Sequence, residues 1–129
     1  MVWKECNVRR SWYAAALLLI LACVLCSAGK YVTYSTRQLD AELREAYAYA
    51  ELGQFSVARE AYTAAAHQSK LKSEIWYLLI RRSLVDQLNQ TLATIPSYVS
   101  EDNLADLAVE TARAREQVCQ ISQSFFSWF

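Results

Sequence analysis

The longest apolar stretch of the chain runs from Trp12 to Gly29 and holds eighteen residues without a charge. At a rise of about 1.5 Å per residue it would form a helix of about 27 Å, close to the roughly 30 Å hydrocarbon core of a bilayer. Its large aliphatic side chains each favour insertion by about 0.3 to 0.6 kcal/mol, roughly 2 to 4 kcal/mol together. They are Leu17, Leu18, Leu19, Ile20, Leu21, Val24 and Leu25. The sequence therefore predicts a transmembrane helix over Trp12–Gly29.

The residues that flank this stretch predict its orientation. Lys4, Arg9 and Arg10 precede it, whereas Lys30 is the one base immediately after it. Because positive charge favours the cytoplasmic side, we expect residues 1–11 to form a cytoplasmic tail and residues 30–129 to lie outside the cytoplasm. The lipid bilayer is thus the first expected partner, through Trp12–Gly29.

Two other interpretations fit the same pattern. Small residues over Ser27–Gly29 suit signal-peptide cleavage, after which residues 30–129 would be secreted. Lipidation at Cys23 is less favoured because Val24 and Leu25 continue the apolar run. A retained anchor is the preferred interpretation.

After the apolar stretch, hydrophobic residues recur at steps of three and four, the spacing of one helix face. The first such stripe is Leu39, Leu43, Ala46 and Ala50, with Asp40, Glu42, Arg44 and Glu45 expected on the solvated side. Gly53 is expected to end this helix, because glycine adopts the left-handed conformation of helix ends. The helix either continues from the apolar stretch or is joined to it by a bend at Gly29.

The next segment matches the turn of a tetratricopeptide hairpin, in which alanines let two helices approach closely. The matching residues are Gly53, Phe55, Ala58, Tyr62 and Ala65. The pattern does not recur thirty-four residues later, at Gln87, Asn89 and Leu92, which argues against a solenoid. The sequence predicts a single helical hairpin.

Two further helices are expected. One is predicted to begin near Ser73 and Glu74 and to kink or end at Pro96. Its apolar face is predicted to consist of Trp76, Leu78, Leu79, Val85, Leu88, Leu92, Ile95 and Val99. The other is predicted to begin after Ser100–Asp102, with the stripe Leu104, Leu107, Thr111, Ala114, Val118, Ile121, Phe125 and Trp128. Residues 30–129 should therefore form a small antiparallel bundle of about four helices.

Composition agrees with an all-α fold, since the chain has two glycines and one proline. Residues 1–11 hold three bases and one acid, a net charge of +2, and residues 30–129 hold ten bases and twelve acids, a net charge of −2. This balance does not favour binding to nucleic acid.

The candidate chemistry is sparse. Cys119 is expected to be a half-buried core residue, with an intermolecular disulfide as the alternative, and His67 is expected to be solvated near a helix end. Lys70, Lys72, Arg81 and Arg82 are expected to form a solvated basic patch, with contact to anionic lipid headgroups as the alternative. Asp86, Glu74 and Glu110 are carboxylates that a small envelope enzyme could use, but no nucleophile–base or metal-ligand pattern accompanies them. We expect no catalytic, cofactor or metal site and no enzymatic activity.

The carboxyl end is rich in aromatic residues, namely Phe125, Phe126, Trp128 and Phe129. Core packing is the favoured interpretation, and a partner-binding or membrane-interface tail is the alternative. Ala14–Ala16 form a small-residue surface on which spans could self-associate.

The layout resembles the DUF4363 family, small membrane-anchored helical proteins of unknown function found mainly in Firmicutes. The resemblance includes the amino-terminal span, the hairpin turn, Trp76 before a long helix, the run Leu92–Val99 and the aromatic end. Members often carry His-x-Glu-Ile-Asp where this chain has residues 82–86, which keep Asp86 alone. The resemblance implies no known activity. The expected function is a membrane-tethered extracytoplasmic interaction or scaffold module.

Overall fold

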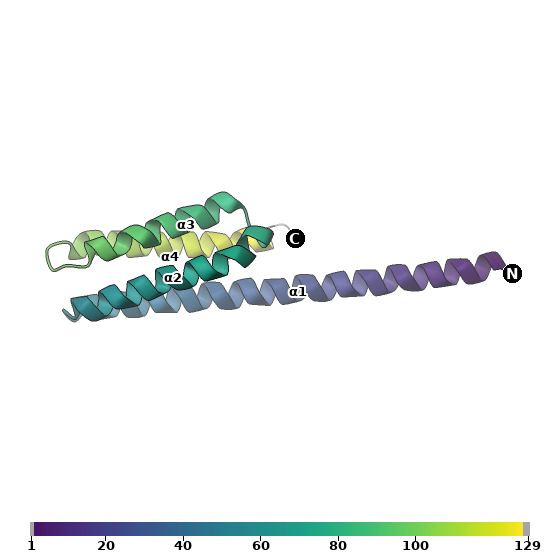
Figure 1. Cartoon of the computed structure of the whole chain (residues 1–129), viewed down its shortest axis with the longest axis horizontal. Helices are drawn as coiled ribbons and strands as arrows, with labels where there is room; N and C mark the ends of the chain where they lie inside the picture. Colours follow the sequence, from purple (N-terminus) through teal and green to yellow (C-terminus); the bar gives the residue numbers. More distant parts are fainter. Residues whose placement is uncertain (1, 128–129) are drawn as a thin grey trace. The chain divides into compact units, whose positions relative to one another are not determined.

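The computed structural model describes residues 2–127, with side chains from Cys6 onward, and these residues form helices joined by short turns (Figure 1). The elements are α1 (Val2–Glu51), α2 (Phe55–Leu79), α3 (Arg82–Thr94), the 3-10 helix η1 (Ile95–Tyr98) and α4 (Leu104–Phe126). The all-α prediction is confirmed. The chain divides into two compact units between Tyr31 and Val32, and each is described separately.

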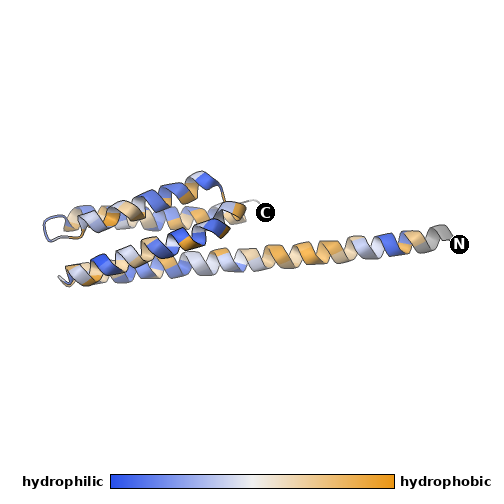
Figure 2. Cartoon of the chain, viewed as in Figure 1, coloured by the Kyte–Doolittle hydropathy of each residue, from blue (hydrophilic) through white to orange (hydrophobic). Residues whose placement is uncertain are grey.

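The first unit is the amino-terminal part of α1. Its large apolar side chains are exposed on every side. Figure 2 shows this part of the helix coloured mostly as hydrophobic. By length and composition α1 could cross a membrane or serve as a signal sequence, with 6% of its most apolar window buried. The expected hydrophobic amino-terminal helix is confirmed, and α1 continues through Gly29 without a break.

The second unit begins with the remainder of α1. Leu39, Leu43, Ala46 and Ala50 are all buried, as their spacing predicts. Gly53 has a positive φ of 82°. Its N–H donates to Ala50 O at 3.1 Å, and the Gln54 N–H donates to Tyr49 O at 3.0 Å. This pair of bonds is a Schellman motif, which explains why glycine ends the helix there.

Helix α2 is longer than the sequence predicts. Ala58, Tyr62 and Ala65 are buried, as the hairpin requires, but α2 continues to Leu79. The expected helix start at Ser73 is therefore wrong. Ser73 lies inside α2, where its hydroxyl donates to Ser69 O at 2.6 Å, a bond that satisfies the hydroxyl without ending the helix. His67 is exposed as expected, but in the middle of α2 rather than near its end.

The chain turns at Ile80 and Arg81, which have extended backbone angles, before α3 begins. The predicted seam is buried throughout: Val85, Leu88, Leu92, Ile95 and Val99. Trp76 is also buried, whereas Leu78 is exposed, so its predicted place on the apolar face is wrong. Pro96 lies in η1, and α3 ends just before it, as predicted.

Helix α4 begins at Leu104, after Ser100–Asp102 as predicted, but its cap residue differs from the predicted one. Asn103, rather than Ser100, precedes its first residue, and its side chain makes no capping hydrogen bond. The predicted stripe is buried at Leu107, Thr111, Ala114, Val118, Ile121 and Phe125. Leu104 is half-buried and Trp128 lies outside the described residues.

Side-chain hydrogen bonds fix the arrangement of the second unit as an antiparallel four-helix bundle. Trp76 Nε1 on α2 donates to Ser35 Oγ on α1 at 3.1 Å, and Arg115 Nε on α4 donates to Asp40 Oδ1 on α1 at 2.8 Å. Arg59 Nη2 near the start of α2 donates to Val99 O beyond η1 at 3.0 Å. We call the end with this last contact the α1–α2 end. The opposite end, where Val32 enters and α2 turns into α3, is the α2–α3 end (Figure 1).

Candidate functional site

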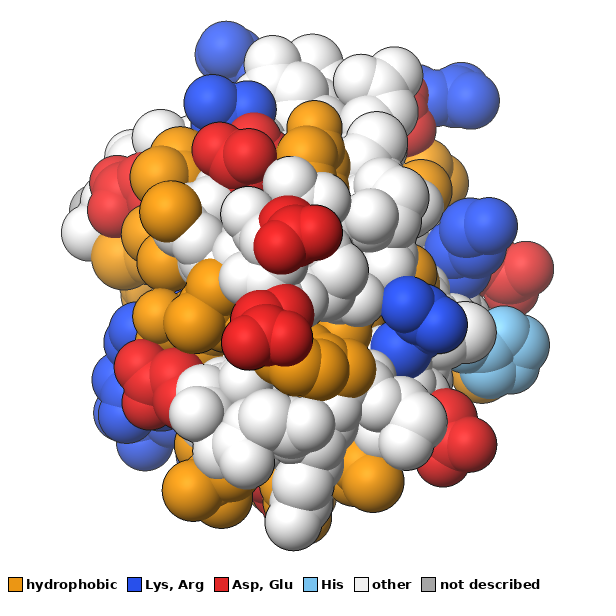
Figure 3. All heavy atoms as spheres, turned by 90° about the vertical axis from the view of Figure 1, so that its left-hand side faces the viewer, with side chains coloured by type: hydrophobic (Ala, Val, Ile, Leu, Met, Phe, Trp, Pro, Cys, Tyr) orange, Lys and Arg blue, Asp and Glu red, His pale blue; other side chains and the backbone are white. Residues whose placement is uncertain are grey.

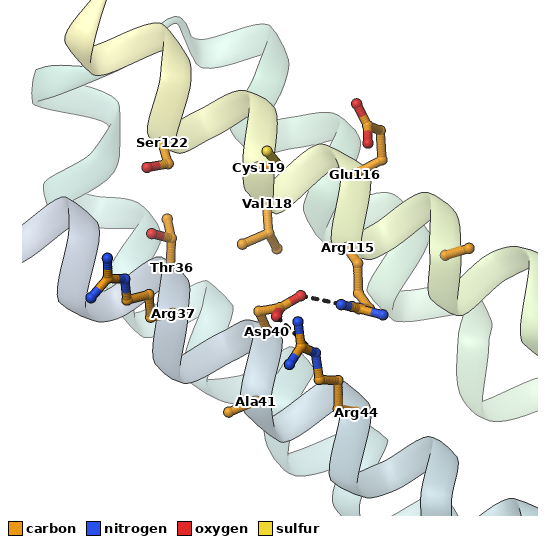
Figure 4. Close-up of a pocket in the computed structure, with 11 residues that line it drawn as sticks. Thr36, Arg37, Asp40, Ala41, Arg44, Arg115, Glu116, Val118, Cys119 and Ser122 are labelled. Carbon is orange, nitrogen blue, oxygen red and sulfur yellow. Dashed lines mark hydrogen bonds and ion pairs between the residues drawn. The ribbon is translucent and has the colours of Figure 1, made fainter.

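The bundle has a groove of about 700 Å³ between α1 and α4 (Figure 4). From α1 it is lined by residues at one-turn spacing, among them Thr36, Asp40 and Arg44. From α4 it is lined by Ala112, Arg115, Glu116, Val118, Cys119 and Ser122. The lining combines small side chains with charged ones.

Asp40 organises the charges of this groove. Its two carboxylate oxygens accept from different arginines, Oδ1 from Arg115 at 2.8 Å and Oδ2 from Arg44 at 3.2 Å. The sequence places Asp40 on a solvated face, which is wrong, since its side chain is half-buried and links α1 to α4. Because one carboxylate faces two guanidinium groups, with Arg37 and Glu116 also on the lining, the groove carries both signs of charge.

Cys119 lies on the lining of this groove and is exposed. The prediction of a half-buried core cysteine is therefore wrong. Val118 occupies the core position, and the next residue along α4 points about 100° away from it, toward α1 and solvent. Cys6, Cys23, Cys26 and Cys119 are all free and exposed.

A second polar cluster lies where α2 faces α3. The Tyr77 hydroxyl donates to Asp86 Oδ1 at 2.6 Å, and this bond to the carboxylate raises the pKa of Tyr77 above its usual value of 10.0. Arg82 lies over the Tyr77 ring at 5.2 Å and has its Nε 3.7 Å from Asp86 Oδ2. The cluster is solvent-exposed, so these contacts add little to stability.

The three carboxylates named as enzyme candidates lie on three different helices. Glu74 is exposed on α2, Asp86 belongs to the α3 cluster, and Glu110 on α4 pairs with Arg113 at 3.1 Å. Within the described residues, no three His, Cys, Asp or Glu side chains are grouped so as to hold a metal ion.

The buried polar side chains form pairs that the sequence analysis missed. Tyr62 on α2 and Thr111 on α4 share a hydrogen bond of 2.8 Å, and burial raises the pKa of Tyr62. Asn89 on α3 accepts from Ser69 at 2.7 Å and donates to Ser73 at 2.8 Å. The spacing of the two serines indicates that they are buried, since Ser69 and Ser73 continue the stripe of Ala58, Tyr62 and Ala65 at steps of four. These bonds hold helices in register rather than forming a reactive centre.

The aromatic carboxyl end separates into two kinds of residue. Phe125 is buried and packs edge-on against Phe126, with 5.5 Å between the ring centroids. The core interpretation is therefore supported for Phe125, whose side chain is not accessible to a partner. Phe126 is half-exposed. Trp128 and Phe129 lie outside the described residues.

Comparison of this chain with protein-family models, with curated proteins and with solved structures finds no match. The resemblance to the DUF4363 family therefore stays a prediction. The function of this chain has to be inferred from its own sequence and structure.

Proposed function

We propose that this protein is a single-span membrane protein whose helical bundle, outside the cytoplasm, is an interaction or scaffold module. The supporting observation is the exposure of apolar side chains around the whole circumference of α1 between Trp12 and Gly29. Leu17, Leu18, Leu19 and Ile20 are each more than 60% exposed, although four consecutive residues cover about 300° of a helix. A helix that is apolar all round requires an apolar environment, and lipid is the one its length fits.

Retention of the anchor is favoured over cleavage by where the bundle begins. Val32, Ser35 and Thr36 are buried in the bundle, and Thr36 Oγ1 donates to Val32 O at 2.7 Å. Cleavage after Ala28 or Gly29 would leave a mature chain that begins within three residues of this packed region. The mass of the mature chain distinguishes a tethered protein from a secreted one.

Two native cysteines provide a test of the topology. Cys6 precedes the span and Cys119 lies on the bundle, and both are exposed. In a background with Cys23→Ala and Cys26→Ala, the C6S variant leaves Cys119 and the C119S variant leaves Cys6. We expect a membrane-impermeant maleimide to label Cys119 in intact cells and Cys6 after permeabilisation. If Cys6 alone is labelled in intact cells, the topology is the reverse of the proposed one. If Cys6 and Cys119 are labelled equally and the protein does not associate with the membrane, the anchor is refuted.

The interaction role is supported by the open groove between α1 and α4, which pairs small side chains with charges of both signs. A photo-crosslinking residue at Ala112, exposed on the groove lining, tests it in the intact membrane, with Thr63 on the outer face of α2 as the matched control position. A crosslink specific to position 112 supports the proposal, and its mass separates a second copy of this chain from another protein. Crosslinks that are equal or absent at both positions would contradict a role for this groove.

A further inference from the structure

The exposed apolar side chains of the bundle are distributed unevenly between its two ends. Near the α2–α3 end, each of three helices exposes at least one large apolar or aromatic residue. They are Tyr34 on α1, Leu71, Ile75 and Leu78 on α2, and Phe126 on α4. We call these five residues the apolar belt. Leu78 is 84% exposed, and its exposure is informative because other exposed apolar residues are clustered at the same end.

The belt is confined to a short depth of the bundle. Leu71 precedes Leu78 by seven residues, so the two lie about 10 Å apart along the axis of α2. Beyond Leu71, the outward positions of α2 are His67, Thr63 and Glu60, all exposed. On α4, the outward residues behind Phe126 are Gln123, Gln120 and Glu116. Helices that lie at a membrane interface are buried by about 5 to 10 Å, which matches this depth.

The α1–α2 end has a different surface. Figure 3 shows acidic side chains near the middle of that end. The residues at its turns and the first turn of α4 include Glu51, Glu101, Asp102 and Asp106. Leu52, Val57 and Val109 are also exposed in this half, but among acids that an anionic surface would repel. At the α2–α3 end, by contrast, Arg81 in the turn and Arg82 at the start of α3 are exposed, and Asp86, 3.7 Å from Arg82, offsets part of their charge.

From these observations we propose that the α2–α3 end of the bundle docks onto the lipid headgroup layer through the apolar belt, with Arg81 and Arg82 binding anionic headgroups. This inference rests on the proposed function, because it assumes that Trp12–Gly29 spans the bilayer. Two residues, Lys30 and Tyr31, separate Gly29 from Val32, so the Cα atoms of Gly29 and Val32 are at most about 11 Å apart. The chain itself therefore holds this end close to the membrane surface, whichever way the bundle tilts.

Docking has a specific chemical consequence. The aromatic rings of Tyr34 and Phe126 suit the interfacial layer, and the Leu78 side chain gains from leaving water. Each arginine near an anionic surface contributes about 1 kcal/mol, so neutral lipid should weaken docking about fivefold for each arginine. The rest of the bundle, including the groove between α1 and α4, is then presented in a fixed orientation to the membrane.

The test uses the full chain without native cysteines, reconstituted in phosphatidylcholine–phosphatidylglycerol vesicles. Single cysteines at Leu78→Cys and Leu52→Cys carry an environment-sensitive fluorophore. These leucines are 84% and 74% exposed and lie at opposite ends of the bundle, so they form a matched pair. We expect a blue-shifted emission at position 78 that is quenched by lipids with a headgroup nitroxide, and water-like emission at position 52.

A third probe separates failure of this inference from failure of the proposed function. A fluorophore at Leu19→Cys should be quenched by lipids with a nitroxide on the acyl chain if the span is inserted. Quenching at 19 with water-like emission at both 78 and 52 would overturn the docking and leave the anchor standing. No quenching at 19 would overturn both. A third outcome is a blue shift at position 78 that disappears when the protein is diluted in lipid and is not quenched by the headgroup nitroxide. It would indicate that a second copy of the chain covers Leu78, which also overturns the docking.

Discussion

Both parts of α1 contain leucines, but these leucines are spaced differently along the helix and differ in burial. Leu19, in the first part, is 68% exposed, and Leu43, in the second, is fully buried. In the first part, leucines are consecutive and cover every side of the helix, whereas in the second they recur at steps of three and four. The comparison shows that spacing, more than hydrophobicity, decides whether a leucine of this chain packs against protein or requires another apolar environment.

The strongest test of this difference is to make the same substitution in both parts of α1. Leu43→Ala should lower the free energy of unfolding of the bundle by about 2 to 5 kcal/mol, because it opens a cavity among fully buried side chains. Leu19→Ala should leave that quantity unchanged, because the Leu19 side chain is 68% exposed and belongs to the other unit. Urea unfolding of the full chain in detergent micelles, followed by circular dichroism, measures both.

Equal losses from the two substitutions would contradict the division into two units at Tyr31 and Val32. Leu39→Ala, in the same buried stripe, is a useful control, because it should resemble Leu43→Ala rather than Leu19→Ala. A loss for Leu43→Ala with none for Leu39→Ala would mean that the α1 stripe is not packed as described.

The bundle also differs from the apolar span in burying polar side chains, and it does so in pairs. Tyr62→Phe should cost about 1 to 3 kcal/mol of stability, because it leaves the buried Thr111 hydroxyl without its partner at 2.8 Å. The double variant with Thr111→Val should recover part of that loss. A double-mutant cycle by urea unfolding measures the coupling, and strictly additive losses would show that the two hydroxyls do not interact.

The same tyrosine gives the bundle a dependence on pH. Burial raises the pKa of Tyr62 in the folded state above the usual 10.0, so the folded state holds this proton more tightly than the unfolded state. Its contribution is fully present below pH 10 and is lost as the pH rises through the folded-state pKa. Tyr62→Phe should reduce the slope of stability against pH above 10. An unchanged slope would assign the alkaline loss to other groups.

Regular spacing made most of the fold predictable. The stripes on α1, α3 and α4 and the glycine turn at Gly53 are confirmed by the structure, because each depends on local periodicity or backbone conformation. The boundary between α2 and α3 was not predictable in this way. Ser73 has the chemistry of a helix cap, but inside α2 its hydroxyl is satisfied by a tertiary hydrogen bond from Asn89 and a local one to Ser69 O, one turn earlier.

The candidate site was less predictable than the fold. The groove between α1 and α4 depends on residues seventy-five positions apart, such as Asp40 and Arg115, and no local pattern links them. The apolar stripe of this helix favours a core position for Cys119, yet one residue on a helix is enough to move a side chain from the buried position of Val118 to the exposed lining. The apolar belt was missed because Leu78 was assigned to a core face, although its spacing from Trp76 places it on the opposite side of α2.

The smallest expected effect concerns Asp86, the carboxylate that an enzymatic interpretation would rely on. Asp86→Asn removes the ion pair with Arg82 at 3.7 Å but keeps an oxygen that can accept from the Tyr77 hydroxyl. Because the pair is solvent-exposed, the loss of stability should be below about 1 kcal/mol. The pKa of Tyr77 should move back toward 10.0, because the charged acceptor that raises it is gone, and ultraviolet titration measures this. A loss as large as that of Leu43→Ala, or a tyrosine titration that does not change, would show that Asp86 does not hold the exposed contacts described and would reopen the question of what this carboxylate does.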